Sequence, residues 1–224
     1  MHMKTLAALA ATTALALGAA ACGGSDDEAA SATSSTQQAE PAATPVAEIP
    51  SLSGKDTAVT LDAGFVEALG SLKLTPAPVG SAEISKDGVA SFPITGGNVT
   101  YYTPGTESPY VQGEVDHDGS GLSLTGGGKK VELTDFVVDP GASVLTGKVS
   151  VDGEVAAESA PLFFLDGRTL NPLEVNQDDG TAVLEGTTVK LKQEAADLLN
   201  QTFDVEALQA GLVIGVAKIT VNTA

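Results

Sequence analysis

The residues best suited to chemistry surround His117, the one histidine that follows the first few residues of the chain. It lies in the segment 116–121, Asp-His-Asp-Gly-Ser-Gly, where the charges of Asp116 and Asp118 would favour a protonated imidazole. The Asp-x-Asp-Gly spacing resembles half of a calcium loop, but no acidic residue follows at the required spacing, and Asp and Gly also form ordinary turns. We predict a turn between two strands, with His117, Asp116 and Asp118 as candidate ligand-binding residues and no metal site.

Three tyrosines that precede this histidine are further candidates for ligand binding. Tyr101, Tyr102 and Tyr110 lie 16, 15 and 7 residues before His117. Adjacent strands can bring residues at such separations to the same end of a sheet. The alternative is that these rings only pack, because aromatic residues are common in strands.

Counting residues excludes several classes of enzyme. One cysteine and two histidines are too few for a His/Cys metal cluster, and a Ser-His-Asp triad would have to use His117. The chain has no Gly-x-Ser-x-Gly elbow, no phosphate loop and no Gly-x-Gly-x-x-Gly motif. Its formal charge of -18 excludes nucleic-acid binding by phosphate neutralisation. We predict a protein that is not an enzyme, and we assign no catalytic residue.

The first 22 residues have the pattern of an export signal. A lysine precedes an uncharged run of about 17 residues, which is short for a membrane span, and small residues lead to Cys22. The sequence Gly-Ala-Ala-Ala-Cys at 18–22 resembles a bacterial lipobox. We predict a signal peptide at 1–21, a lipidated Cys22 and an exported protein on the outer face of the cell membrane or cell envelope, with the lipid as the contact to the membrane. The alternative is ordinary cleavage near Ala21, which leaves a free thiol.

The composition changes at about residue 50. Residues 22–50 are rich in Ala, Ser, Thr, Gln and Pro, so they cannot bury enough apolar surface to offset their chain entropy. We therefore predict a disordered linker at 22–50 and a folded domain at 51–224.

Most of that domain has the pattern of short strands. Runs of Val, Thr, Leu and Ile alternate with Gly, Asp and Pro roughly every ten residues, which predicts an antiparallel β-sandwich or barrel-like domain. Residues 121–125 and 129–136 flank three glycines and predict a hairpin. Further strands are expected at 143–151, 160–165 and 181–191, a hairpin tip at 176–180, and a central strand at 212–221.

Two segments predict short packed helices. Residues 62–69 begin with Asp62 as a cap and would bury Phe65, Val66 and Leu69, and residues 193–203 carry a second apolar stripe. Residues 57–69 and 187–199 also align, as do 80–84 and 215–219. We interpret the alignment as an internal repeat of strand, helix and strand, with chance similarity as the alternative.

Several short motifs lie between residues 89 and 150. They are Phe92-Pro93-Ile94 with Gly96-Gly97, Val111 to Val115, His117-Asp118-Gly119 leading to Leu122, Val131 to Asp139, and Leu145 to Val149. Together they resemble the HtaA-type domains of bacterial surface haem-uptake proteins. The resemblance implies a β-rich domain that binds haem through a tyrosine on an N-terminal helix, assisted by a histidine that His117 matches. The corresponding helix here contains no tyrosine.

Two classes of function follow from these observations. The first is an exported, lipid-anchored binding module that captures haem or another small hydrophobic ligand through His117 and one of the tyrosines. The second is a structural or adhesive envelope lipoprotein without a small-molecule ligand, and hydrolysis by paired carboxylates is a third alternative. A deep apolar pocket beside His117 would favour the first class, whereas a filled sandwich with His117 on an exposed turn would favour the second.

Overall fold

The computed structural model describes residues 43–223. The predicted signal peptide at 1–21, Cys22 and most of the predicted linker lie outside the described residues. The helices are α1 (Ala63–Ser71), α2 (Gln193–Phe203) and the 3-10 turn η1 (Gly167–Thr169). The strands are β1 (Ala47–Ile49), β2 (Lys55–Leu61), β3 (Thr75–Gly80), β4 (Glu83–Ile84), β5 (Val89–Pro93), β6 (Gly96–Tyr101), β7 (Val111–Gly126), β8 (Lys129–Asp139), β9 (Val144–Val151), β10 (Glu154–Asp166), β11 (Glu174–Asn176), β12 (Thr181–Leu191) and β13 (Val213–Asn222).

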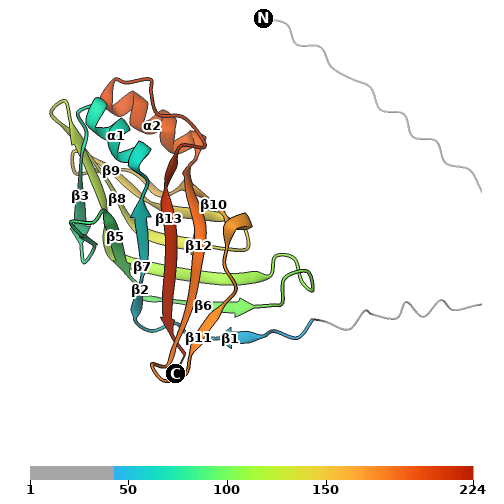
Figure 1. The fold of residues 1–224 in the computed structure, drawn as a ribbon. Coiled ribbons are helices and arrows are strands. Elements are labelled where there is room, and N and C mark those ends of the chain that lie inside the picture. The colour runs from blue at the N-terminus through green and yellow to red at the C-terminus, as the bar shows by residue number, and fades with distance from the viewer. Residues whose placement is uncertain (1–42, 224) are drawn as a thin grey trace, which may run out of the picture. The chain divides into compact units, whose positions relative to one another are not determined.

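The strands form one antiparallel sheet that curls into a half-barrel (Figure 1). Its main path runs β1-β6-β7-β8-β9-β10-β12-β13-β2-β5-β4, while β3 pairs with β7 and β11 pairs with β12. The prediction of a mainly β, barrel-like domain with two short packed helices is confirmed. The strand β1, at 47–49, lies before the predicted boundary at residue 51 and pairs with the end of β6.

One edge of β7 pairs with two different strands. β6 pairs with residues 111–116 of β7, and β3 pairs with residues 120–125. Between these pairings, the backbone carbonyls of Asp116 and Gly119 accept bonds from the amides of Thr95 (2.8 Å) and Ser81 (3.1 Å). These bonds connect the residues that follow β5 and β3 to the middle of β7.

The predicted strand pattern agrees closely with the observed elements. β7 and β8 form the hairpin expected around the three glycines, and β9, β10 and β12 cover the three further strands. The tip expected at 176–180 connects β11 to β12. β13 lies between β12 and β2, so the prediction of a central strand is confirmed.

Both helices lie where the sequence predicts them. The carboxylate of Asp62 accepts bonds from the amides of Gly64 (2.8 Å) and Phe65 (3.3 Å), which caps α1 as expected. Phe65 and Leu69 are buried, but Val66 is 48% exposed, so its predicted burial is wrong. The reason is that a helix of only nine residues presents one narrow face to the core, and Val66 lies beside that face.

Removal of the α1 cap gives a first testable prediction. Asp62→Ala leaves two amides of the first turn without their carboxylate partner, so we expect the free energy of unfolding to fall by about 1 kcal/mol. Asp62→Asn keeps an oxygen acceptor and should stay within a few tenths of a kcal/mol of the native protein. Urea unfolding of both variants measures the difference, and equal losses would show that the cap bonds contribute nothing.

The internal repeat agrees with the fold in its first half only. β2 and β12 both pair antiparallel with β13, so they run in the same direction, and the helix that follows each of them emerges at the same end of the sheet (Figure 1). The second halves differ, because 80–84 is a turn with the two-residue strand β4, whereas 215–219 is the middle of β13. The proposed strand-helix-strand unit is thus a strand-helix unit, and its third element is wrong.

The core lies inside the curl and under the helices. Leu69 of α1 and Ala196 and Leu199 of α2 are buried at the helical end, together with Val131, Val149 and Leu162 from the sheet. No helix among residues 43–223 is both long enough and apolar enough to cross a membrane.

Candidate ligand-binding cavity

A cavity of about 650 Å³ lies against the inner face of the curled sheet. Eight strands contribute inward-facing side chains to its wall: Thr57 and Val59, Phe92, Val111 and His117, Phe136 and Val138, Leu145, Leu165, Thr187 and Val189, and Ala217 and Ile219. The pairs two residues apart reflect the period of a strand, which points alternate side chains to the same face. The cavity is therefore the unfilled interior of the half-barrel.

The rim of this cavity is formed by two connections. One is the β6–β7 loop and the other is the end of β10 with η1. The exposed wall residues on these connections define the cavity rim: Pro104, Ser108, Pro109, Phe164, Gly167 and Arg168. Phe164 is 44% exposed, so an aromatic ring borders the opening.

His117 reaches the wall because β7 and β8 are both irregular beside it. The pairing of β7 with β8 skips from His117 to Gly121, and the pairing of β8 with β9 skips from Thr134 to Val137. Such β-bulges redirect nearby side chains. The bulge in β7 is held by Ser120, whose hydroxyl donates to the carbonyl of His117 (3.0 Å), and by Asp135, which accepts from the amide of Gly119 (2.8 Å).

The imidazole of His117 is buried and fully hydrogen-bonded. Its exposed fraction is 1%. Nδ1 lies 3.3 Å from the carbonyl oxygen of Phe136, and Nε2 lies 2.8 Å from Oγ1 of Thr57. A carbonyl oxygen only accepts, so we assign the proton to Nδ1, and the Thr57 hydroxyl then donates to Nε2. The histidine thus joins β2, β7 and β8 at the cavity wall.

Burial makes this histidine neutral at physiological pH. It lowers the pKa of His117 to about 4, because the charged form loses its hydration, while the bond to Phe136 and the charges of Asp118 and Asp56 oppose the shift without cancelling it. The planes of the Phe92 and His117 rings lie at 88° to each other, with centroids 6.5 Å apart, so an aromatic neighbour also borders the imidazole. His117 is thus a neutral ring of fixed orientation in the cavity wall.

The sequence interpretation of segment 116–121 needs two corrections. The segment lies inside β7, not in a turn between strands, because its Asp and Gly residues form the bulge instead. The flanking acids also do not hold His117 in its protonated form, since burial outweighs them. Asp118 is exposed and pairs with Thr95 (3.2 Å), and Asp116 is half-buried beside Gly96, so neither lies on the cavity wall.

Of the three tyrosines, only Tyr110 lies on the cavity wall. Tyr101 is buried behind it, and the two rings meet edge to face with centroids 6.0 Å apart. The half-buried Tyr102 contributes a backbone bond, from its amide to the carbonyl of Tyr110 (2.7 Å). Burial and the neighbouring Tyr101 raise the pKa of Tyr110 above its ordinary value, so the free phenol is neutral.

In the part of the chain that the structure describes, Arg168 and Asp166 are the only Lys, Arg, Asp or Glu residues on the cavity wall. The Asp166 carboxylate accepts bonds from Nε (2.8 Å) and Nη2 (2.6 Å) of Arg168 and from Nζ of Lys190 (2.7 Å). Sequence reasoning missed this group, because Lys190 lies 24 residues from Asp166 along the chain. The local signal was an apolar strand that ends in Asp-Gly-Arg, which also fits a plain turn.

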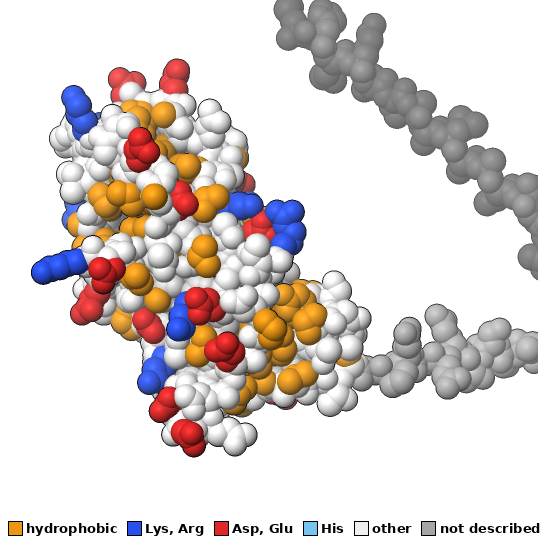
Figure 2. All heavy atoms as spheres, in the orientation of Figure 1, with side chains coloured by type: hydrophobic (Ala, Val, Ile, Leu, Met, Phe, Trp, Pro, Cys, Tyr) orange, Lys and Arg blue, Asp and Glu red, His pale blue; other side chains and the backbone are white. Residues whose placement is uncertain are grey.

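Metal binding by clustered side chains finds no support in the described part of the chain. Among residues 43–223, no group of three or more His, Cys, Asp and Glu side chains is placed to hold a metal ion. The face of the molecule seen in Figure 2 shows acidic and basic side chains scattered between apolar ones.

Comparison with solved structures places this architecture among known folds. The C-terminal domain of HtaA from Corynebacterium glutamicum superposes with a TM-score of 0.54 at 13% identity, over 77% of this chain and 98% of that domain. The chain has the HtaA fold. A domain-swapped H434A variant of the same domain gives 0.44 at 14% identity, over 72% of this chain and 92% of that one. The haem-binding protein HtaB from the same organism gives 0.45 at 9% identity, over 79% and 96%. No family model and no curated protein matches the sequence.

The haem ligand implied by the resemblance to HtaA-type domains has no counterpart in α1. That helix carries no tyrosine, and none of its residues lies on the cavity wall. Tyr110, which lies within residues 89–150, is the phenol that borders the cavity. The wall therefore has an oxygen donor for an iron porphyrin, but it comes from the β6–β7 loop.

Proposed function

We propose that this domain is a binding module that captures haem, or a tetrapyrrole of similar size, in the cavity of the half-barrel. The observation that carries the proposal is the cavity itself, about 650 Å³ of mainly apolar space with Tyr110 and His117 on its wall. Its size falls within the roughly 300–1,000 Å³ of small-molecule sites. A deep pocket beside a buried His117 supports this class of function over a structural lipoprotein with a filled core.

The character of the wall fits a flat aromatic ligand. Phe92 and Phe136 pack edge to face with centroids 5.3 Å apart, and Tyr110 and Phe164 add rings toward the rim. Aromatic walls contribute large apolar contact area and stack on conjugated rings. The HtaA fold and the motif at 89–150 support haem as the ligand to test first.

Two wall residues have distinct roles in this proposal. Tyr110 would hold the iron through its phenol oxygen, and haem would supply the metal centre and the conjugated ring. His117 has both ring nitrogens engaged by Thr57 and Phe136, so it shapes the wall and contacts the ring instead of binding iron. Lipid anchoring at Cys22 would hold the domain at the outer face of the membrane, where such a ligand arrives from outside.

A haem titration followed in the Soret region tests the proposal. We expect saturable binding of one haem per chain by the native protein. Tyr110→Phe should lose at least about tenfold in affinity, which corresponds to 1.4 kcal/mol, and should shift the Soret band, because the axial oxygen is gone.

The matched control is Tyr102→Phe, which removes a hydroxyl from the adjacent strand end without touching the cavity wall. It should bind haem as the native protein does. No saturable binding by the native protein would reject the proposed function, and equal spectra for both variants would reject Tyr110 as the donor.

A further inference from the structure

We propose that Arg168 is a recognition site for a carboxylate of the ligand, so that the cavity selects a tetrapyrrole with free acid side chains. The inference rests on the proposed function and specifies its ligand. Arg168 lies on the rim of the mainly apolar cavity, with its side chain 82% exposed. A carboxylate attached to an apolar body in the cavity would meet this guanidinium at the opening.

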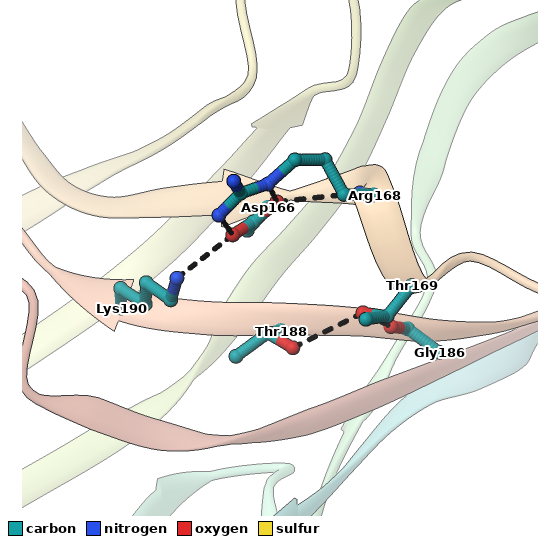
Figure 3. A network of polar contacts seen from close by, with 6 residues as sticks. All are labelled: Asp166, Arg168, Thr169, Gly186, Thr188 and Lys190. Carbon is teal, nitrogen blue, oxygen red and sulfur yellow. Dashed lines mark hydrogen bonds and ion pairs between the residues drawn. The ribbon is translucent and has the colours of Figure 1, made fainter.

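The guanidinium is held in place before any ligand arrives. Asp166 binds it side-on through Nε and Nη2, and it also accepts from the Arg168 amide (3.2 Å) and from Lys190, as Figure 3 shows. Arginine has five N–H donors, and only two of those on its side chain point to Asp166. The others are available for a planar carboxylate, and a fixed guanidinium loses little entropy when it binds one.

This site has one more cation than the buried carboxylate of Asp166 needs for charge compensation. Asp166 is largely buried, with 8% of its side chain exposed, so it needs one cation for compensation. Lys190, whose side chain is 24% exposed, supplies that cation from β12. Hydrogen bonds from Arg168 and from Lys190 hold the pKa of Asp166 well below its usual range, so the carboxylate stays ionised and the three side chains keep a net charge of +1.

This positive site differs from the rest of the molecule. The chain as a whole has a formal charge of -18, and within residues 43–223 the other Lys and Arg residues lie off the cavity wall. At the position of η1, the short orange turn that follows β10 in Figure 1, Figure 2 shows Lys or Arg side chains (blue) on either side of acidic ones (red). An anionic group is repelled by the molecule in general and attracted at this point of the rim, which orients the ligand with its acid groups outward.

The experiment compares protoporphyrin IX with its dimethyl ester, which has the same ring but no carboxylates. Binding to the purified full-length chain is followed by porphyrin fluorescence. We expect the native protein to bind the free acid about five- to tenfold more tightly than the ester, and Arg168→Gln to abolish that preference while binding the ester normally. Rising salt should weaken only the native preference for the acid.

The control variant is Lys218→Gln, which removes an equal charge from an exposed pair with Glu185, away from the cavity wall. It should keep the preference for the acid, which separates a local contact from the overall electrostatic field.

A native protein that binds acid and ester equally, or an Arg168→Gln variant that still prefers the acid, overturns this inference and leaves the proposed function intact. No binding of either porphyrin would reject both. Displacement of the porphyrin by an equal concentration of palmitate would assign the site to fatty acids and overturn its assignment to tetrapyrroles.

Discussion

Acidification from pH 7 to pH 4 should remove about 3 kcal/mol from the free energy of unfolding through His117 alone. Its pKa is lowered to about 4 in the folded protein and is about 6.5 in an unfolded chain. Between these values the unfolded state binds a proton that the folded state does not, so stability falls as the pH falls through 6.5 toward 4. The difference between these two pKa values corresponds to about 3 kcal/mol, at 1.36 kcal/mol for each pKa unit. Above pH 7 the group is neutral in both states and contributes no pH dependence.

Urea unfolding of the native protein and His117→Gln between pH 7.5 and pH 4 measures this contribution. The other histidine of the chain is His2, so no other histidine in the folded domain contributes to the difference between the two curves. Carboxylates titrate in both proteins and cancel. A difference that stays constant across the pH range would contradict the burial of a neutral His117. If the variant does not fold, an NMR titration of the His117 ring in the native protein gives the pKa directly.

Ala217→Trp should reduce haem affinity by about 100-fold, equivalent to about 2.7 kcal/mol. Ala217 is 6% exposed on β13, and its side chain lies on the cavity wall next to Val59, its cross-strand partner on β2. An indole at this position would occupy space that the ligand needs. Because that space is open, the ring should not destabilise the fold by more than about 1 kcal/mol, whereas an indole forced into a packed core costs about 1–3 kcal/mol.

Ala58→Trp is the matched control for this variant. Ala58 lies between Thr57 and Val59, which both line the cavity, so its own side chain points to the outer face of β2. We expect haem affinity within about twofold of the native value for this variant. Equal losses of affinity in both variants would contradict binding inside the half-barrel. A large loss of stability in Ala217→Trp alone would contradict an open cavity.

The strands could be predicted from the sequence where Gly and Asp residues lie in the turns between elements. The glycines at 126–128 end β7 and begin β8, and Asp62 begins α1 through its own carboxylate. The same turn chemistry misled at Asp118 and Gly119, where a positive φ of 68° at Gly119 serves a bulge within a continuous strand. Local composition does not distinguish a turn from a bulge, because both require a residue that adopts this backbone conformation.

The burial of His117 had a signal in the sequence. Val111, Val115 and His117 are in phase along β7 and are all buried, while Glu114 and Asp118, in the alternate phase, are exposed. The acids on either side therefore occupy the other face. The Asp166 group had no such signal, because its cations meet only through the pairing of β10 with β12. The cavity was likewise not predictable, since it depends on how far the sheet curls.

A crystal structure of the protein saturated with haem is the most direct test of binding inside the half-barrel. We expect one tetrapyrrole there, between the rings of Phe92 and Phe136 and the wall of β12 and β13. Its iron should face Tyr110, and an acid side chain should contact Arg168. A haem bound to the outer surface, with the cavity empty or closed by the wall residues, would show that the cavity is not the binding site.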